Sequence, residues 1–502
     1  MLKKWSAAIS RGLASKMFLR IALLWFILGA VVIALTSKYP MAFDENWHLG
    51  LIQVYAKYWL PFDIPKTPDM AALGAATSDP SYFFHYLMSF PYRVMNTWHW
   101  SQTSIIITLR MMDIAMFTGA LILFWKTLRG LGLSLAKANV VIAGITLIPI
   151  APLLAAEINY DNLMLLFVAG LFWLTVQITT SLRTSKRLNP VQAYLLLAVI
   201  FFGCATKYAF MPLALISGVW IVFLMIRHHM RWRHFWQQIR RLPKTKHILL
   251  VLLVIIGGTL LSRDVYNLAT YHKLAPPCDY FFSVNECEAY GPWDRDYHLK
   301  EEKPIRHPNF VAKSYPAYII SDWIPGITTR LFFTVSGPED DYDSAEPLPI
   351  PVSIYVTFCL LGFAGLVWSF WLLARRNPIV WYILATILLY CLSLSLDVYK
   401  SYRATAEPVA INGRYLLPLA PLIGFVLLTG LDELVTKLRF KKYLPSVCAV
   451  ALLIIVAQGG GAVTYFALAK NSWFLPGIAQ STGEWLRAVL SHTILLHWPW
   501  QK

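Results

Sequence analysis

The sequence predicts an all-α polytopic membrane protein. Of its 502 residues, 57% are hydrophobic and 14% are charged, which is too apolar for a soluble domain with one core. Apolar stretches of roughly 17 to 25 residues recur along the chain, the length that an α-helix needs to cross ~30 Å of hydrocarbon. We therefore expect about eleven transmembrane helices.

Each expected helix ends where charged or turn-forming residues interrupt the apolar sequence. The expected helices cover residues 20–37, 104–125, 139–156, 162–180, 190–206, 209–226, 247–263, 350–373, 379–396, 415–431 and 444–468. An acidic turn, Glu157–Asn162, separates the third helix from the fourth. Only Lys207 and its neighbours separate the fifth from the sixth. Arg263 and Asp264 end the seventh.

The net charge of +17 is distributed by loop. Basic residues fill alternate connections: Lys3, Lys4, Arg11, Lys16 and Arg20, then Arg183, Lys186 and Arg187, then Arg227, Arg231, Arg233, Arg240, Arg241, Lys244 and Lys246, then Lys437, Arg439, Lys441 and Lys442. The positive-inside rule then places these loops and the N-terminus in the cytoplasm, and an odd number of helices places the C-terminus outside. We expect a plasma (inner) membrane protein whose basic loops meet anionic membrane lipids, and no nucleic-acid partner.

Two external loops are longer than simple connections, and loops of that length are usually functional. They cover residues 38–103 and 264–348 of a transmembrane domain that runs from 1 to 470. The aromatic segment Ser81–Phe90 is too short to span and predicts a helix lying in the membrane interface. Residues 471–502 predict an external amphipathic tail, with capping-box spacing from Ser481 to Glu484. Cys278 and Cys287 lie in the second loop and would form a disulfide in an oxidising compartment.

A group of ionisable residues, Asp44-Glu45-Asn46-Trp47-His48, follows the first expected helix directly. A carboxylate there could deprotonate a hydroxyl or bind a divalent cation, with a second carboxylate or a histidine tuning its pKa. Asp44 and His48 would share one face of a helix. In the alternative interpretation, Asp44 is an N-cap and Glu45 lies in the first helical turn. The spacing Glu45-x-x-His48 is also part of a metal-ligand motif, but the sequence lacks the HExxH pair of a zinc peptidase and has no second ExxH.

Other charged residues fall at helix ends on the same expected side of the membrane. Besides the turn that contains Asp161, these are Lys207, Arg403 and Arg414, the last followed by Tyr415. Such cations could clamp a phosphate-bearing headgroup, or they could be ordinary interfacial side chains that extend toward water. Arg110 and Asp113 are three residues apart in the second expected helix and predict a structural ion pair.

Three short motifs, FDENWH at 43–48, INYDN at 158–162 and NGRYLLPL at 412–419, together resemble the GT-C superfamily of membrane glycosyltransferases. That superfamily includes protein O-mannosyltransferases and the aminoarabinose transferase of lipid A. The pattern is most similar to a group of bacterial multipass proteins usually placed near it, over most of residues 20 to 430. The chain departs from the superfamily at Ser78-Asp79-Pro80, and it has no WWD-type motif, which argues against asparagine-linked transfer.

The resemblance implies a GT-C-like fold and the inverting transfer of a sugar from a polyprenyl-phosphate carrier to an extracytoplasmic acceptor. It places the base at Asp44, with Glu45 and His48 beside it, and a second acidic position at Asp161. Phosphate contacts fall on Arg414 and Tyr415, with Lys207 and Arg403 as further candidates. The alternatives are a transporter or flippase of lipid-linked saccharides, which would carry charge deep within several helices, and a noncatalytic scaffold.

Overall fold

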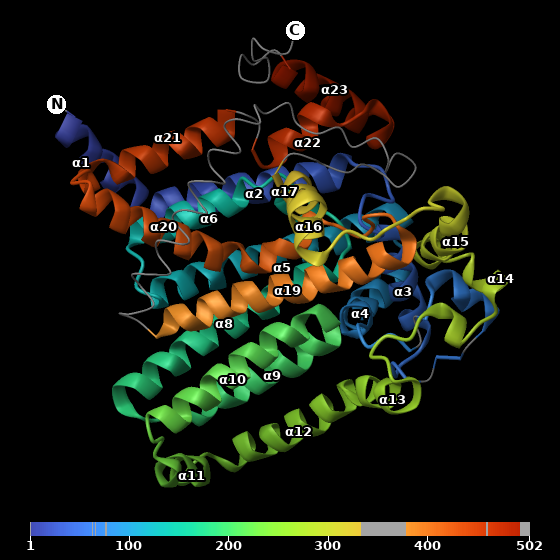
Figure 1. The fold of residues 1–502 in the computed structure, drawn as a ribbon, viewed down its shortest axis with the longest axis horizontal. Coiled ribbons are helices and arrows are strands. Elements are labelled where there is room, and N and C mark those ends of the chain that lie inside the picture. Colours follow the sequence, from blue (N-terminus) through green and yellow to red (C-terminus); the bar gives the residue numbers. More distant parts are fainter. Residues whose placement is uncertain are drawn as a thin grey trace.

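The computed structural model describes residues 2–62, 64–65, 67–75, 78–332, 378–457 and 460–491 (Figure 1). The fold of these residues is helical, and an isolated bridge between Ser37 and Phe474 is the only β-type pairing among them. The first helices are α1 (Leu2–Leu13), α2 (Lys16–Thr36), α3 (Glu45–Lys57), α4 (Phe83–Thr97), α5 (Gln102–Gly130), α6 (Leu135–Thr146), α7 (Ile150–Ala155), α8 (Tyr160–Ser185), α9 (Pro190–Thr206) and α10 (Met211–Arg227). The later helices are α11 (Trp232–Arg240), α12 (Lys244–Leu260), α13 (Ser262–Tyr271), α14 (Val284–Cys287), α15 (Gly291–Arg306), α16 (Tyr315–Tyr318), α17 (Ile324–Phe332), α19 (Ile379–Thr405), α20 (Ala420–Lys437), α21 (Leu444–Ala457), α22 (Ala462–Leu468) and α23 (Ile478–Ser491).

Seven helical segments of the described chain are long and apolar enough to cross a membrane, as a polytopic membrane protein requires. They are Lys16–Thr36, Gln102–Gly130, Tyr160–Ser185, Tyr208–Arg227, Lys244–Tyr271, Ile379–Thr405 and Gly413–Lys437. Each overlaps one of the eleven expected helices. Of the other four, the helix expected at 190–206 is the shorter α9, and 350–373 lies outside the described residues.

The remaining two expected helices, 139–156 and 444–468, are each divided in two. The first becomes α6 and α7, and the second becomes α21 and α22. The two breaks contact each other, because the N–H of Gly461 donates to the carbonyl of Leu147 at 2.8 Å. Gly461 has φ +71°, a conformation that glycine adopts without steric cost, and a Cβ there would lie 3.0 Å from the carbonyl oxygen of Thr146. Hydropathy alone did not reveal either break.

α8 is the central helix of the bundle. Of its most apolar stretch, 72% is buried, against 22% for α2 and for the α12–α13 segment. It packs against α5, α9 and α10 (Figure 1). The first turn of α8 is therefore enclosed by protein, and a charged side chain placed there is shielded from lipid.

Polar side chains start several of these helices. Ser15, Ser101 and Ser134 accept hydrogen bonds from backbone N–H groups in the first turns of α2, α5 and α6. The capping box expected at Ser481 is wrong. α23 begins earlier, at Ile478, and the hydroxyl of Ser481 donates to the carbonyl of Gly477 at 3.2 Å.

Helices α3, α4, α14 and α15, which belong to the two long loops expected outside the membrane, lie together at one end of the bundle (Figure 1). The helix expected at Ser81–Phe90 is present as the longer α4. Cys278 and Cys287 form a disulfide in this region, with Cα atoms 5.8 Å apart. α11, which belongs to the most basic loop, lies at the other end of the bundle (Figure 1).

The distribution of Lys and Arg predicts which of these two ends faces the outside of the cell. In a background without unpaired cysteines, a single cysteine at Lys300 should react with an impermeant thiol reagent in intact cells, whereas one at Arg233 should not. Both positions are exposed, so burial would not prevent either reaction. Labelling of Arg233 but not of Lys300 would contradict the expected orientation.

Candidate functional site

Asp44 precedes α3 directly, as the N-cap interpretation expects, but its side chain makes no capping hydrogen bond. Phe43 and Asp44 both have positive φ, +59° and +67°. Aspartate tolerates this left-handed conformation better than most residues do, although it still costs roughly 1–3 kcal/mol. The Asp44 side chain is 53% exposed. Its carboxylate is therefore not engaged by the helix and is accessible to water.

Glu45 lies in a different environment, in a buried ion pair with Arg110. The Arg110 Nε–Glu45 Oε1 and Arg110 Nη2–Glu45 Oε2 distances are 2.8 and 2.7 Å, and both side chains are at most 1% exposed. The predicted ion pair between Arg110 and Asp113 is therefore wrong, because a tertiary partner outcompetes the neighbour three residues along the helix. Asp113 is fully buried, and its carboxylate has no hydrogen-bond partner among the described residues.

The Glu45–Arg110 pair joins three segments of backbone. Glu45 also accepts from the N–H groups of Met41, at 2.7 Å, and Ile158, at 3.1 Å. Arg110 Nη1 donates to the carbonyls of Ala34 and Ser37 at the end of α2, both at 3.0 Å. With both carboxylate oxygens occupied in this way, Glu45 positions the segment that carries Asp44 and has no free oxygen for a proton.

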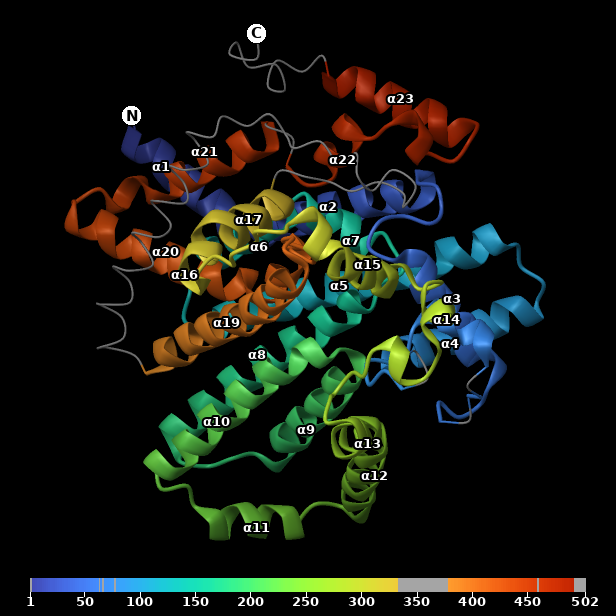
Figure 2. The same ribbon diagram turned by 45° about the vertical axis from the view of Figure 1, so that its right-hand side comes forward.

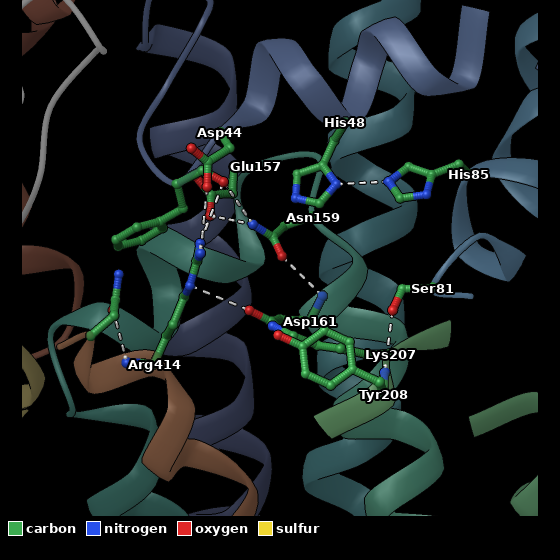
Figure 3. A network of polar contacts seen from close by, with 12 residues as sticks. Asp44, His48, Ser81, His85, Glu157, Asn159, Asp161, Lys207, Tyr208 and Arg414 are labelled. Atoms are coloured by element: carbon green, nitrogen blue, oxygen red, sulfur yellow. Dashed lines mark hydrogen bonds and ion pairs between the residues drawn. The ribbon is translucent and has the colours of Figure 1, made fainter. Parts of the chain in front are cut away.

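The structure brings together four of the residues singled out in the sequence (Figure 3). Lys207 Nζ lies 2.5 Å from Asp161 Oδ1, and Arg414 Nε lies 3.4 Å from Asp161 Oδ2. Arg414 Nη2 lies 3.7 Å from Asp44 Oδ2. The side chains of Asp161, Lys207 and Arg414 are each 4–6% exposed. Two buried cations therefore share one buried carboxylate, and Asp44 is the half-exposed member of the group.

Local sequence explains why these side chains meet. Asp161 lies in the first turn of α8, where a carboxylate interacts favourably with the helix dipole. Lys207 is the single extended residue between α9 and the short 3₁₀ turn that precedes α10. Arg414 lies in the 3₁₀ segment Gly413–Leu419, and its own N–H donates to the capping side chain of Asn412.

Gly413 fixes the position of Arg414. A Cβ at Gly413 would lie 2.4 Å from the backbone nitrogen of Leu331 in α17, so only glycine allows this contact. The NGR sequence thus combines a cap, a close backbone contact and a buried guanidinium. This local chemistry makes the motif recognisable in the sequence.

Aromatic rings surround the two cations. Lys207 Nζ lies 4.2 Å from the ring centroid of Tyr160 and 4.9 Å from that of Tyr415. The Arg414 guanidinium lies 4.7 Å from the ring of Phe43 and 5.4 Å from that of Tyr415. Tyr415 therefore contacts both cations, and the rings replace part of the hydration that burial removes.

Glu157 and Asn159 form the wall of the site beneath Asp44 (Figure 3). Asn159 donates to the carbonyl of Phe43 at 3.1 Å, and its side-chain oxygen caps α8. Burial raises the pKa of Glu157 well above its usual value, and nearby Arg414 offsets this only in part. Glu157 therefore ionises less readily than an exposed glutamate and is a weaker partner for the cations.

Arg403 is not brought to this group. It is exposed in the last turn of α19, and its described contact is a hydrogen bond from Lys303 Nζ to its backbone carbonyl at 2.5 Å. The structure therefore does not support Arg403 as a phosphate contact of this site. The position of Arg403 between two expected helices predicted that it lies on the external side of the membrane. It gave no information about the distance of Arg403 from Asp161.

His48 pairs with a residue that the sequence analysis did not single out. His48 Nδ1 lies 2.8 Å from His85 Nε2, and the two rings stack with centroids 5.1 Å apart. Burial lowers the pKa of His85 to about 3, and burial together with His85, Arg414 and Lys207 lowers the pKa of His48 well below 6.5. Both imidazoles are therefore neutral at pH 7. His85 lies in the aromatic α4 segment, and nothing in the spacing there marks it as a partner.

This histidine pair predicts a loss of stability in acid. Because the unfolded histidines titrate near 6.5, the unfolded chain binds more protons below that pH, and the folded state loses stability as the pH falls from about 6.5 toward 3. The slope should reach about 1.4 kcal/mol per pH unit for each histidine. His85→Gln should flatten the decline of the thermal unfolding midpoint between pH 6.5 and 5, and His298→Gln, at an exposed histidine, should not. An equal dependence of the unfolding midpoint on pH in the wild type, His85→Gln and His298→Gln would contradict this account.

In the part of the chain that the structure describes, no three His, Cys, Asp or Glu side chains gather as metal ligands. The carboxylate of Glu45 is bound by Arg110, and His48 is bound by His85, so the Glu45-x-x-His48 spacing does not create a site by itself. No protein-family model, curated protein or solved structure matches this chain.

Proposed function

We propose that this chain is a membrane glycosyltransferase that moves a sugar from a polyprenyl-phosphate carrier to an acceptor of the cell envelope. The acceptor is a glycan, lipid or protein outside the cytoplasm. The supporting observation is the half-exposed carboxylate of Asp44, 3.7 Å from a buried guanidinium that shares Asp161 with Lys207. A carboxylate that can accept a proton, next to two cations that can bind a phosphate, supports transfer from a phosphate-linked donor.

The two cations have distinct tasks in this mechanism. Arg414 presents a planar set of donors that can bind two phosphate oxygens, and Lys207 adds a second positive charge from the opposite side of Asp161. As the bond between the anomeric carbon and the phosphate oxygen breaks, negative charge develops on the departing phosphate. Buried cations stabilise that charge more strongly than exposed ones would.

Asp44 acts on the other substrate. It accepts the proton of the acceptor hydroxyl while the hydroxyl oxygen forms its bond to the anomeric carbon, on the face opposite the phosphate. The result is inversion at that carbon and release of the carrier phosphate. Asp161 does not compete for this task, because its two oxygens face Lys207 and Arg414.

The donor-binding half of the proposal is tested by Arg414→Lys, which keeps the charge but removes the planar fork. We expect the KM for the polyprenyl-phosphate sugar to rise about 10-fold or more, since hydrogen bonds to charged groups contribute about 1.5–3 kcal/mol. Arg403→Lys is the matched control and should leave KM unchanged. An unaltered KM in a folded Arg414→Lys protein would remove Arg414 from the phosphate site.

A further inference from the structure

A polar cavity lies at the ends of α8 and α9 that are remote from Asp161 and Lys207. It has a volume of about 380 Å³ and is lined by Ser181, Ser185, Arg187, Asn189, Gln238 and Arg241, among others. These residues come from the end of α8, the connection to α9, and α11 with its C-terminal flank. Because α8 is 26 residues long, it spans about 39 Å at 1.5 Å per residue. The cavity and Asp161 therefore lie on opposite faces of the membrane.

The cavity carries positive charge that no acidic residue of the described chain pairs with. Arg187 and Arg241 both line it, and neither forms an ion pair with a described residue. The sequence from residue 162 to 263 contains no Asp or Glu at all. A counter-charge for these two guanidiniums must therefore come from another segment or from outside the protein.

The polar lining also includes an unused acceptor. The side-chain oxygen Oε1 of Gln238 is buried and has no hydrogen-bond partner among the described residues, while its Nε2 lies 3.1 Å from His234 Nε2. Guanidiniums donate to a phosphate, whereas an amide oxygen accepts from a hydroxyl. The combination matches a ligand that carries both groups.

α11 places the cavity at the level of lipid headgroups. It lies across the end of the bundle between α10 and α12 (Figure 2). Trp232 and Trp236 are exposed and four residues apart, so they share one face of the helix. Tryptophan on a basic amphipathic helix is typical of the membrane interface.

We propose that this cavity binds the headgroup of an anionic phospholipid that bears free hydroxyls, as phosphatidylglycerol does. The phosphate lies between Arg187 and Arg241, and a headgroup hydroxyl donates to Gln238 Oε1. A volume of about 380 Å³ falls within the ~300–1,000 Å³ of small-ligand pockets. This site is independent of the transferase proposal, since it uses none of the same residues.

The test is equilibrium binding by the full-length protein, delipidated in a neutral detergent. Short-chain phosphatidylglycerol should bind saturably, and it should bind tighter than phosphatidylcholine or phosphatidylethanolamine of the same chain length. The double variant Arg187→Gln/Arg241→Gln should bind phosphatidylglycerol roughly 30-fold more weakly, at about 1 kcal/mol for each basic residue. The control Arg233→Gln/Arg240→Gln also removes two positive charges, both from the α10–α12 connection that carries Arg241, without touching the cavity lining, and should bind like the wild type.

Equal weakening in the two double variants would show a diffuse electrostatic effect and overturn the proposal. Protection against thermal unfolding by inorganic phosphate as strong as that by phosphatidylglycerol would also overturn it, because the lipid headgroup would not be recognised. Gln238→Leu provides a further check on the hydroxyl contact. It should reduce the preference for phosphatidylglycerol over phosphatidic acid of the same chain length, and an unchanged preference would remove the hydroxyl from the proposal.

Discussion

Asp44→Asn is expected to slow sugar transfer by about 10² to 10⁴-fold, the contribution typical of a general base. The substitution removes the proton acceptor and keeps the shape of the side chain. It should also keep the backbone, because asparagine is as well suited as aspartate to the left-handed conformation found at this position. Since the carboxylate makes no capping hydrogen bond, the thermal unfolding midpoint should change little.

The matched control is Asp296→Asn, at a partly exposed carboxylate of α15 that pairs with its neighbour Arg295. It should leave both turnover and stability unchanged. A folded Asp44→Asn protein that transfers sugar at the wild-type rate would exclude Asp44 as the base. That result would not affect the assignment of the helical fold or of the ion pairs of Asp161.

Arg110→Met is expected to destabilise the folded protein by about 3–5 kcal/mol, because it leaves the carboxylate of Glu45 buried without its partner. The measurement is thermal unfolding in detergent. The double variant Glu45→Gln/Arg110→Met removes both charges and should regain part of this loss. Arg306→Met breaks an exposed ion pair with Glu302 and should cost no more than about 1 kcal/mol.

A wild-type unfolding midpoint in Arg110→Met would contradict the positioning role of this pair. So would an equal loss in the single and double variants, since the effect would then come from the size of the side chain and not from an unpaired charge. The double variant also separates folding from catalysis. If Glu45 only positions the loop, transfer should recover together with stability.

Most of the membrane helices could be predicted because hydrophobic length is a local property of the sequence. The division of 139–156 and 444–468 could not, since each break is stabilised by the contact between Gly461 and Leu147. A contact between distant segments also explains why the predicted ion pair between Arg110 and Asp113 is wrong. Helical spacing favoured Asp113, but the bonded partner is Glu45, which is 65 residues away in the sequence.

The group around Asp161 was partly predictable for a different reason. Lys207 and Arg414 interrupt apolar sequence, and a charge at such a position is retained only where a partner or a polar cavity stabilises it. Sequence could therefore identify these residues and place Arg414 ahead of Arg403, but it gave no distance between Arg403 and Asp161. His85 was missed because a neutral buried histidine among aromatic residues leaves no pattern of charge or spacing.

The most direct test of the transferase proposal is to follow a doubly labelled polyprenyl-phosphate sugar in vesicles that contain the purified protein and cell-envelope acceptors. The proposal predicts that wild-type protein releases free polyprenyl phosphate and moves the sugar label to an acceptor, and that Asp44→Asn does neither. Movement of the intact donor between leaflets, with no cleavage of the bond between sugar and phosphate, would contradict it and would favour a flippase.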